Sequence, residues 1–199
     1  RTGHSQEKVS DMTNEITADI CVIGGGSGGL SVAAGASQMG ADVVLLESGK
    51  MGGDCLNYGC VPSKAMIAAA HAAHAVRSAG RFGIDSGEPS VDFEKVHDHV
   101  HGVIGAIAPH DSVERFEGMG VRVIQERGRF VGPNRVQAGD TVITAKRIVI
   151  STGSRAGVPP IPGLEDVPFL TNETVFDKKS APDHLIVIGG GPIGSELAQ

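Results

Sequence analysis

A short apolar segment that leads into a cluster of glycines is the feature that most constrains the fold. Residues 18–23 are mostly apolar and precede a run in which Gly24, Gly26 and Gly29 have the spacing of dinucleotide-binding turns. A helix of small residues is predicted over 30–39, and a second apolar strand over 41–46 ends at Glu47. Strand, glycine turn, helix and strand form a βαβ unit, which belongs to a parallel sheet. The chain is therefore predicted to be an α/β protein with a Rossmann-like first domain.

The glycines and the acid have separate roles in such a unit. The glycines allow a tight turn, a close approach to a pyrophosphate and close packing of the helix, whereas the acid after the second strand binds ribose hydroxyls. Glu47 lies near the expected interval of about 20 residues after the turn. The alternative is a glycine-rich turn without function, and the complete set of elements around the turn argues against it.

The same glycine spacing occurs again near the end of the sequence. Residues 185–188 are apolar and precede Gly189, Gly191 and Gly194. This repeat predicts a strand over 185–188 and the start of a second Rossmann domain at residues 183–199, whose glycines approach a second dinucleotide. We expect the sequence to be a fragment that ends inside the first helix of that domain.

Helices and then strands are predicted between the two glycine turns. Helices are expected over 62–80 and 91–118, the second interrupted near Pro109. Short β-like runs predict an antiparallel meander over 121–124, 128–131, 135–138 and 141–144. A parallel strand is expected over 147–151, and a boundary at the Pro- and Gly-rich residues 158–163. The predicted parts are a first domain (16–155), a connecting segment (156–182) and the start of the second domain.

The composition excludes several classes of function. The net charge of −6, with 40% hydrophobic and 20% charged residues, indicates a protein with a core and no basic face for nucleic acid. No apolar stretch approaches the roughly 18 residues of a membrane span, and the polar start lacks the apolar core of a secretory signal. We therefore expect a cytoplasmic protein that binds neither nucleic acid nor membranes. Residues 1–15 are expected to be a disordered leader or upstream sequence.

Cys55 and Cys60 predict a thiol pair that opens and closes. Cysteines at this spacing in one regular helix point in opposing directions, beyond the roughly 7 Å limit between the Cα atoms of a disulfide. Gly59 relaxes the backbone between them and Pro62 suits the first turn of the next helix, so both sulfurs are expected at a helix N-terminus, within disulfide reach. The helix dipole would then lower the thiol pKa from about 8.5 into the range of roughly 3.5 to 7.5.

Structural or metal-binding roles for these residue types are less favoured. A structural disulfide that closes so short a loop would contribute only about 2 kcal/mol. Zinc sites favour cysteines closer in sequence and a second ligand pair. Cys21 is expected to be a buried hydrophobe in the first strand. The histidine pairs 71/74 and 97/101 each share a helix face without a matching carboxylate or cysteine, so polar helix surface is expected and no metal site is predicted.

The stretch Gly52 to Lys64 (GGDCLNYGCVPSK), both glycine turns and residues 151–154 (STGS) together resemble the class I pyridine nucleotide-disulfide oxidoreductases. Dihydrolipoamide dehydrogenase, mercuric reductase and glutathione reductase belong to this family. The resemblance runs from about Ile16 to Gln199. It implies FAD in the first domain, NAD or NADP in the second, and a homodimer when the protein is complete. The implied substrate is a small-molecule or protein-bound disulfide, or a metal ion.

The resemblance also implies roles for individual residues. Cys60 would be the thiol beside the flavin and Cys55 the interchange thiol that faces the substrate. Lys64 would lie near the flavin, with Glu196 as its partner. The implied FAD-binding residues are Gly24, Gly26, Ser27, Gly28, Gly29, Glu47, Gly53, Asp54, Thr152 and Gly153. The residues implied to approach NAD or NADP are Gly189, Gly191 and Gly194.

Two residues depart from the pattern of the family. Asp54 replaces the usual threonine before the first cysteine, and Tyr58 replaces a small or aliphatic residue. We expect Asp54 to raise the pKa of the neighbouring thiol by like-charge repulsion.

The leading hypothesis is a FAD-dependent oxidoreductase that passes electrons between NAD(P)H, flavin and the Cys55–Cys60 disulfide to a dithiol, disulfide or metal-ion substrate. One alternative is a non-catalytic redox sensor or soft-metal-binding module. Another is a flavoprotein of different chemistry whose thiols are only structural. Residues 1–199 made alone are expected to bind FAD weakly or not at all, and to show no steady NADH- or NADPH-driven disulfide reduction.

Overall fold

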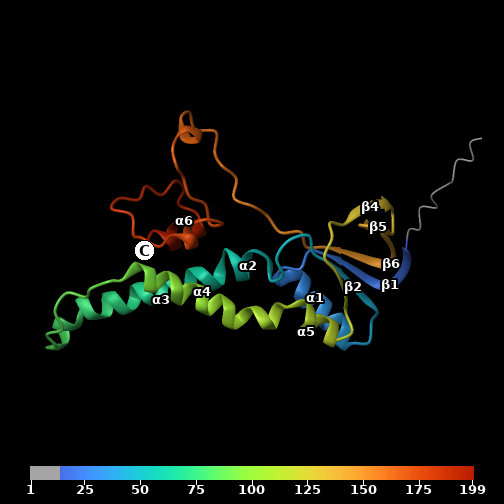
Figure 1. The fold of residues 1–199 in the computed structure, drawn as a ribbon, viewed down its shortest axis with the longest axis horizontal. Coiled ribbons are helices and arrows are strands. Elements are labelled where there is room, and N and C mark those ends of the chain that lie inside the picture. The colour runs from blue at the N-terminus through green and yellow to red at the C-terminus, as the bar shows by residue number, and fades with distance from the viewer. Residues whose placement is uncertain (1–13) are drawn as a thin grey trace, which may run out of the picture.

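A six-stranded sheet lies at one end of the molecule (Figure 1). The structure is a computed structural model and describes residues 14–199. The strand order is β3-β2-β1-β6-β5-β4. The parallel strands are β1 (Asn14–Ile23), β2 (Val43–Leu46), β3 (Arg122–Ile124) and β6 (Thr141–Ile150). The antiparallel strands β4 (Arg129–Gly132) and β5 (Arg135–Ala138) continue the sheet beyond β6. The predicted α/β class, with a parallel sheet and an antiparallel meander, is confirmed.

Both faces of the parallel strands are covered. All four residues of β2 are buried, as expected of a strand inside a parallel sheet. On one face, Val22, Val43 and Leu45 pack against α1 (Ser27–Gln38) and α5 (Val113–Gly118) through Leu30, Ala33 and Phe116. On the other face, Cys21 packs with Val44, Leu46, Val136 and Ile143. Cys21 is thus the buried hydrophobe that the sequence predicts, and burial raises the pKa of its thiol to about 11.

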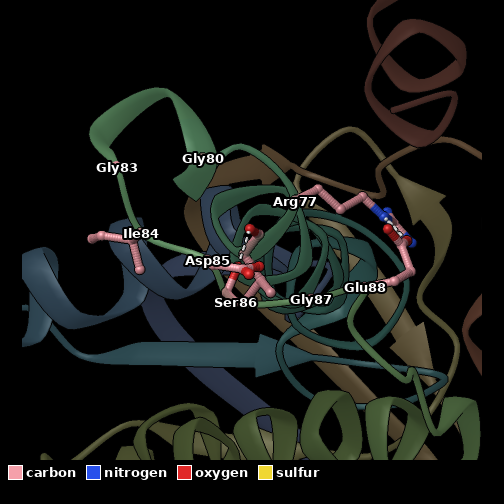
Figure 2. A pocket seen from close by; sticks show the side chains of 9 residues that line it. Arg77, Gly80, Gly83, Ile84, Asp85, Ser86, Gly87 and Glu88 are labelled. Carbon is pink, nitrogen blue, oxygen red and sulfur yellow. Dashed lines mark hydrogen bonds and ion pairs between the residues drawn. The ribbon is translucent and has the colours of Figure 1, made fainter.

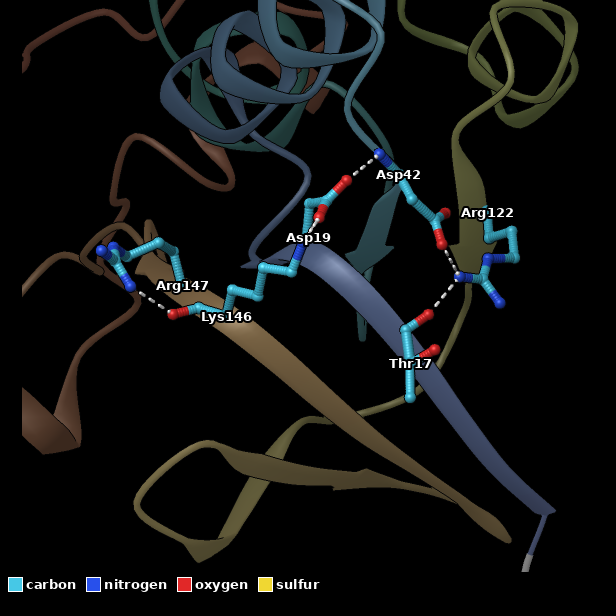
Figure 3. Close-up of polar contacts among 6 residues, drawn as sticks. All are labelled: Thr17, Asp19, Asp42, Arg122, Lys146 and Arg147. Carbon is cyan, nitrogen blue, oxygen red and sulfur yellow. Dashed lines mark hydrogen bonds and ion pairs between the residues drawn. The ribbon is translucent and has the colours of Figure 1, made fainter.

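Polar side chains join the four parallel strands at the edge of the sheet where β2 and β3 begin (Figure 3). Asp19 on β1 accepts a hydrogen bond from Lys146 of β6 at 2.6 Å and another from the backbone N–H of Asp42 at 2.9 Å. Arg122 on β3 donates to Asp42 at 2.7 Å and to the carbonyl of Thr17 at 2.6 Å. These contacts fix the register at the end of the sheet opposite the glycine turn.

Two long helices extend away from the sheet as an antiparallel pair (Figure 1). The short helix α2 (Gly53–Asn57) leads into α3 (Cys60–Arg77), and α4 (Phe93–Ile107) returns beside α3. The side chain of Asp92 caps α4 by accepting a hydrogen bond from the Lys95 N–H. A 3₁₀ turn around Pro109 (Ala108–Asp111) separates α4 from α5. The two predicted helical regions, and the break between α4 and α5, are confirmed.

The last quarter of the chain has little regular structure. After β6 it forms only two 3₁₀ turns, Leu164–Asp166 and Val175–Asp177, and the helix α6 (Pro192–Leu197). It returns to the α3–α4 pair (Figure 1), where Phe176 and Leu197 pack with Ala65 and Val100. None of the helices in residues 14–199 is long and apolar enough to cross a membrane.

Several predicted strand boundaries are wrong. Residues 122–124 belong to the parallel sheet beside β2, not to the meander, because their pairing partner comes from the N-terminal half of the chain. Residues 141–144 and 147–151 form one strand, β6, apart from Ser151, since β1 is long enough to pair with both segments. β1 begins at Asn14, two residues inside the predicted leader, and residues 1–13 lie outside the described part. Residues 185–188 form no strand, since no described strand pairs with them.

Candidate functional site

The first glycine turn joins β1 to α1, and two of its positions require glycine. Gly24 has φ +110°, and a Cβ atom there would lie 2.2 Å from the Ser151 carbonyl oxygen. A Cβ atom on Gly29 would lie 1.8 Å from the carbonyl oxygen of Gly24. The absence of side chains therefore lets β6 and the first turn of α1 approach the loop closely.

The N-terminus of α1 opens at this turn. Gly26 is the N-cap residue, and no side chain accepts a hydrogen bond from the first amide groups of the helix. Such uncapped amides, with the helix dipole, form a binding site for an anion such as a phosphate. Ser27 and Gly28 are the first two residues of α1 and supply amides of this kind.

The acid Glu47 lies across the glycine turn. Its Oε2 atom accepts a hydrogen bond from the Gly25 N–H at 2.6 Å, and its Oε1 atom accepts one from the Gly49 N–H at 2.6 Å. The carboxylate is thereby fixed directly after β2, at the carboxyl edge of the sheet, where nucleotides bind in open α/β sheets.

The cysteine segment packs directly against the glycine turn. Gly26 and Gly52 form a β-bridge, and the Gly52 N–H donates to the Gly25 carbonyl at 2.9 Å. A Cβ atom on Gly53 would lie 2.6 Å from the Gly26 Cα atom, so Gly53 also has to be a glycine. Two loops that the sequence separates by a helix and a strand are thus joined into one site.

Cys55 and Cys60 lie on different helices, as their spacing predicts. Cys55 is in the middle of α2, Cys60 is the first residue of α3, and Gly59 is the N-cap between them. Both are free thiols, and Cys60 acts on Cys55 by raising the pKa of its thiol. Only Cys60 is itself part of the longer helix α3; Cys55 lies in the five-residue α2, and the backbone N–H of Cys60 acts on its sulfur.

The fall in thiol pKa that the helix dipole predicted is wrong for Cys55. Burial raises the pKa of the Cys55 thiol to about 11, and the hydrogen bond with Cys60 and the charge of Cys60 act in the same direction. A smaller repulsion comes from Asp111. Removal of the thiolate from water therefore outweighs the favourable backbone hydrogen bond from Cys60.

The two residues that depart from the family pattern both contact Asn172. The Asn172 side chain donates to Asp54 Oδ1 at 2.9 Å and to the Tyr58 carbonyl oxygen at 3.4 Å. The ring of Tyr58 lies below the Lys50 ammonium, at 5.2 Å. Asp54 thus holds the connecting segment, and the acid that raises the pKa of Cys55 is Asp111 instead.

Lys64 and Glu196 form an ion pair between α3 and α6, as the resemblance to the family implies. The Ser63 hydroxyl donates to the same carboxylate oxygen at 2.8 Å. Hydrogen bonds from Lys64 and then Ser63 lower the pKa of Glu196. Ser63 had no feature in the sequence that indicated this role, because its partner is on a distant helix.

Residues 151–154 follow β6 beside the first glycine turn. The Ser151 N–H donates to the Ile23 carbonyl at 2.8 Å, and the Ser151 hydroxyl contacts the carbonyls of Ile23 and Gly24. Thr152 and Gly153 are exposed, and Gly153 has φ +68°. They lie at the same carboxyl edge of the sheet as Gly24 and Glu47.

The second glycine turn has the same local geometry as the first. Gly189 has φ +112°, and a Cβ atom on Gly194 would lie 2.1 Å from the Gly189 carbonyl oxygen. Gly191 is the N-cap of α6, without a side-chain cap. The turn therefore forms although residues 185–188 do not pair as a strand.

Two cavities of similar volume lie in different parts of the described residues. One of about 390 Å³ lies beside Cys55, between α1, α2 and α5. The other, of about 400 Å³, lies where α3 ends, and Figure 2 shows Arg77 reaching Glu88 there in an ion pair of 2.6 Å. This second cavity contains none of the predicted site residues.

The histidines form no metal site in the described part of the chain, where no group of three or more metal-ligating side chains occurs. His71 and His74 are exposed, as expected. The ring centres of His97 and His101 instead lie 4.2 Å apart, with the rings tilted by 41°. His101 also contacts the Phe176 carbonyl at 3.2 Å, so this pair is partly buried and is not simply helix surface.

Comparison with known proteins identifies the family. The family model described as pyridine nucleotide-disulphide oxidoreductase matches residues 18–199. The chain belongs to this family. It is 36% identical over 187 residues to the mercuric reductase of Streptomyces lividans, covering 91% of the chain and 40% of that protein. It is also 36% identical over 190 residues to the dihydrolipoyl dehydrogenase of Haloferax volcanii, covering 90% and 39%.

A solved structure shows the same fold. The HOCl-induced flavoprotein disulfide reductase RclA from Escherichia coli, solved as a Cu(II) complex, matches with a TM-score of 0.74 and 26% identity. The match covers 90% of this chain and 38% of that one. The chain therefore spans about two fifths of the length of these relatives.

The family implies the use of FAD and a nicotinamide dinucleotide, and the first glycine turn fits FAD. Cβ atoms on Gly24, Gly29 or Gly53 would collide with backbone. The glycines therefore allow a compact turn whose backbone a ligand can approach closely. The uncapped amides of α1 suit a pyrophosphate, and Glu47 stands where a ribose is bound in such units.

Proposed function

We propose that this chain is the N-terminal part of a FAD-dependent oxidoreductase that passes electrons between NAD(P)H and a disulfide, dithiol or metal-ion substrate through Cys55 and Cys60. The observation that carries the proposal is the position of the thiol pair. Cys60 lies close enough to Cys55 to raise the pKa of its thiol, and the Gly26–Gly52 bridge holds the segment that carries both cysteines against the nucleotide-type turn. A structural disulfide would not require this contact with the turn.

The residues of the first domain that hold FAD in this proposal surround the glycine turn. The amides of Ser27 and Gly28 bind the pyrophosphate, Glu47 binds a ribose, and Thr152 and Gly153 line the same edge of the sheet. When bound, FAD supplies a two-electron carrier between the nicotinamide and the sulfur pair. Lys64, held by Glu196, places a positive charge one turn after Cys60 on α3. Gly189, Gly191 and Gly194 begin the part of the protein that binds NAD or NADP.

The thiols perform the exchange with a disulfide substrate. The Cys55 thiol loses its proton to solvent, and the resulting thiolate attacks one substrate sulfur. The substrate S–S bond breaks, and the first product leaves as a thiolate. The Cys60 thiolate then attacks the Cys55 sulfur, which releases the second product thiolate and forms the Cys55–Cys60 disulfide. Reduction of this disulfide by two electrons restores both thiols. Cys55 is the outer thiol in this scheme because it lines the cavity of about 390 Å³, whereas Cys60, the more exposed of the two, lies outside that cavity.

The proposal is tested with single cysteine variants of the complete flavoprotein. With the flavin oxidised and before any reductant is added, Cys55→Ser should show a long-wavelength charge-transfer absorbance and Cys60→Ser should lack it, because only the free thiolate beside the oxidised flavin can donate to the ring. The buried Cys21→Ala variant is the matched control and should behave as the wild type. Identical spectra for the Cys55 and Cys60 variants would contradict the assigned roles, and a complete protein without flavin would contradict the proposed function.

A further inference from the structure

The cavity beside Cys55 is suited to a small apolar ligand. Its volume of about 390 Å³ is within the usual range of roughly 300 to 1,000 Å³ for small-molecule sites. Most of its wall is apolar and is formed by Leu30, Leu56, Val61, Ile107 and Phe116. Cys55 contributes the reactive group.

Besides Cys55, only two ionisable residues line this cavity, Asp111 and Arg115. Asp111 is half-buried in the turn after α4, and its carboxylate lies against the cysteine segment, because a Cβ atom on Gly52 would be 3.1 Å from Asp111 Oδ2. The charge of Asp111 also acts on the Cys55 sulfur, since it contributes to the raised pKa of that thiol.

The positive charge of Arg115 is directed elsewhere. Its guanidinium donates to the His110 carbonyl oxygen and lies 5.7 Å from the centre of the Phe116 ring. Among residues 14–199 no ion pair joins Arg115, or any other basic residue, to Asp111. Asp111 thus has no ion-pair partner within the described residues, although Arg115 lines the same cavity.

We propose that Asp111 is a specificity-determining residue of the Cys55 cavity, which selects neutral apolar disulfides over disulfides with a carboxylate close to the reacting sulfurs. The inference rests on the proposed function, because it assigns the substrate class of the same thiol. A substrate carboxylate that enters this half-buried space meets the charge of Asp111 at short range, where solvent screens it less than on the open surface. A neutral substrate loses nothing there and gains contact with the apolar wall.

The test compares two alkylating reagents that differ in charge. In the reduced complete protein, Cys55 is labelled with neutral iodoacetamide or with anionic iodoacetate, and tandem mass spectrometry measures each rate at Cys55 and at Cys60. Asp111→Asn should raise the iodoacetate-to-iodoacetamide rate ratio at Cys55 about threefold to tenfold and leave the ratio at Cys60 nearly unchanged. The use of a ratio removes any general change in thiol reactivity or accessibility.

Two further variants control this experiment. Asp111→Glu keeps the charge and should keep the wild-type ratio. Glu117→Gln removes an exposed acid of α5 that does not line the cavity, and should also keep it. An unchanged ratio in Asp111→Asn, or an equal change at Cys60, would overturn the proposal.

A substrate pair then tests the selectivity in turnover. Lipoamide and lipoate have the same disulfide ring, and only lipoate has a carboxylate. The wild type should prefer lipoamide in kcat/KM, and Asp111→Asn should reduce this preference about threefold or more. If the complete protein reduces no disulfide with NADH or NADPH, the proposed function fails, whereas the alkylation ratios still decide the role of Asp111.

Discussion

Replacement of Gly29 by alanine tests the close approach of α1 to the glycine turn. The added Cβ atom would lie 1.8 Å from the Gly24 carbonyl oxygen, whereas a carbon–oxygen contact needs about 3.5 Å. Gly24 cannot move away to relieve this clash, because backbone also packs on its other side. A Cβ atom at Gly24 would lie only 2.2 Å from the Ser151 carbonyl oxygen. We expect Gly29→Ala to lower the free energy of unfolding by about 3 kcal/mol, the upper end for overpacked sites.

The matched control is Gly35→Ala in the same helix. A Cβ atom on Gly35 has no neighbour within 4 Å, so alanine should raise the free energy of unfolding by roughly 0.5–1 kcal/mol through its better helix propensity. Urea unfolding followed by far-UV circular dichroism measures both variants, and the two should differ by about 3–4 kcal/mol. Equal stability of Gly29→Ala and Gly35→Ala would refute the steric argument for this turn.

Two other contacts give predictions of their own. Glu196→Gln should lower Tm at neutral pH, because Lys64 and Ser63 hold the pKa of Glu196 below its usual 4.5. This stabilisation is fully present above pH 4.5 and is lost as the pH falls through the pKa of Glu196 in the folded protein. The Tm values of the variant and the wild type should therefore converge in acid. The control is Glu165→Gln, which changes an exposed acid of the 3₁₀ turn Leu164–Asp166. A Tm difference that does not depend on pH, or an equal effect of this control, would contradict the prediction. Asn172→Ala should cost about 1 kcal/mol, since it removes the hydrogen bonds to Asp54 and Tyr58. In a double-mutant cycle with Asp54→Ala the losses should be less than additive, and full additivity would exclude the contact.

Patterns that act over a few residues could be interpreted from the sequence. The glycine turns require particular backbone angles and close approaches, which only glycine allows, so their spacing indicated both turns, and the second forms with the geometry of the first. The separation of Cys55 and Cys60 excluded a single helix for steric reasons, and the structure has Gly59 between two helices. The Lys64–Glu196 pair was predicted through the resemblance to a family, not from the spacing of the residues.

Contacts between distant segments could not be predicted, because no local pattern encodes them. Residues 122–124 have the same β-like composition as the meander. They join the parallel sheet only because the backbone edge of β2 that does not face β1 is available for pairing. Residues 185–188 are apolar enough for a strand, but a strand needs hydrogen-bonding partners and the described chain provides none.

The chemistry of the site depends on both levels. The sequence by itself determined the reactive groups and the nucleotide-type turns, because these follow from residue type and local backbone geometry. Only the tertiary structure decided the environment of the thiols. Burial and the contact with Cys60 raise the pKa of Cys55, where the helix dipole alone predicted a fall. Asp111 reaches the cavity of Cys55 because the turn around Pro109 folds back onto the cysteine segment, and the desolvation and charge at a site depend on such packing.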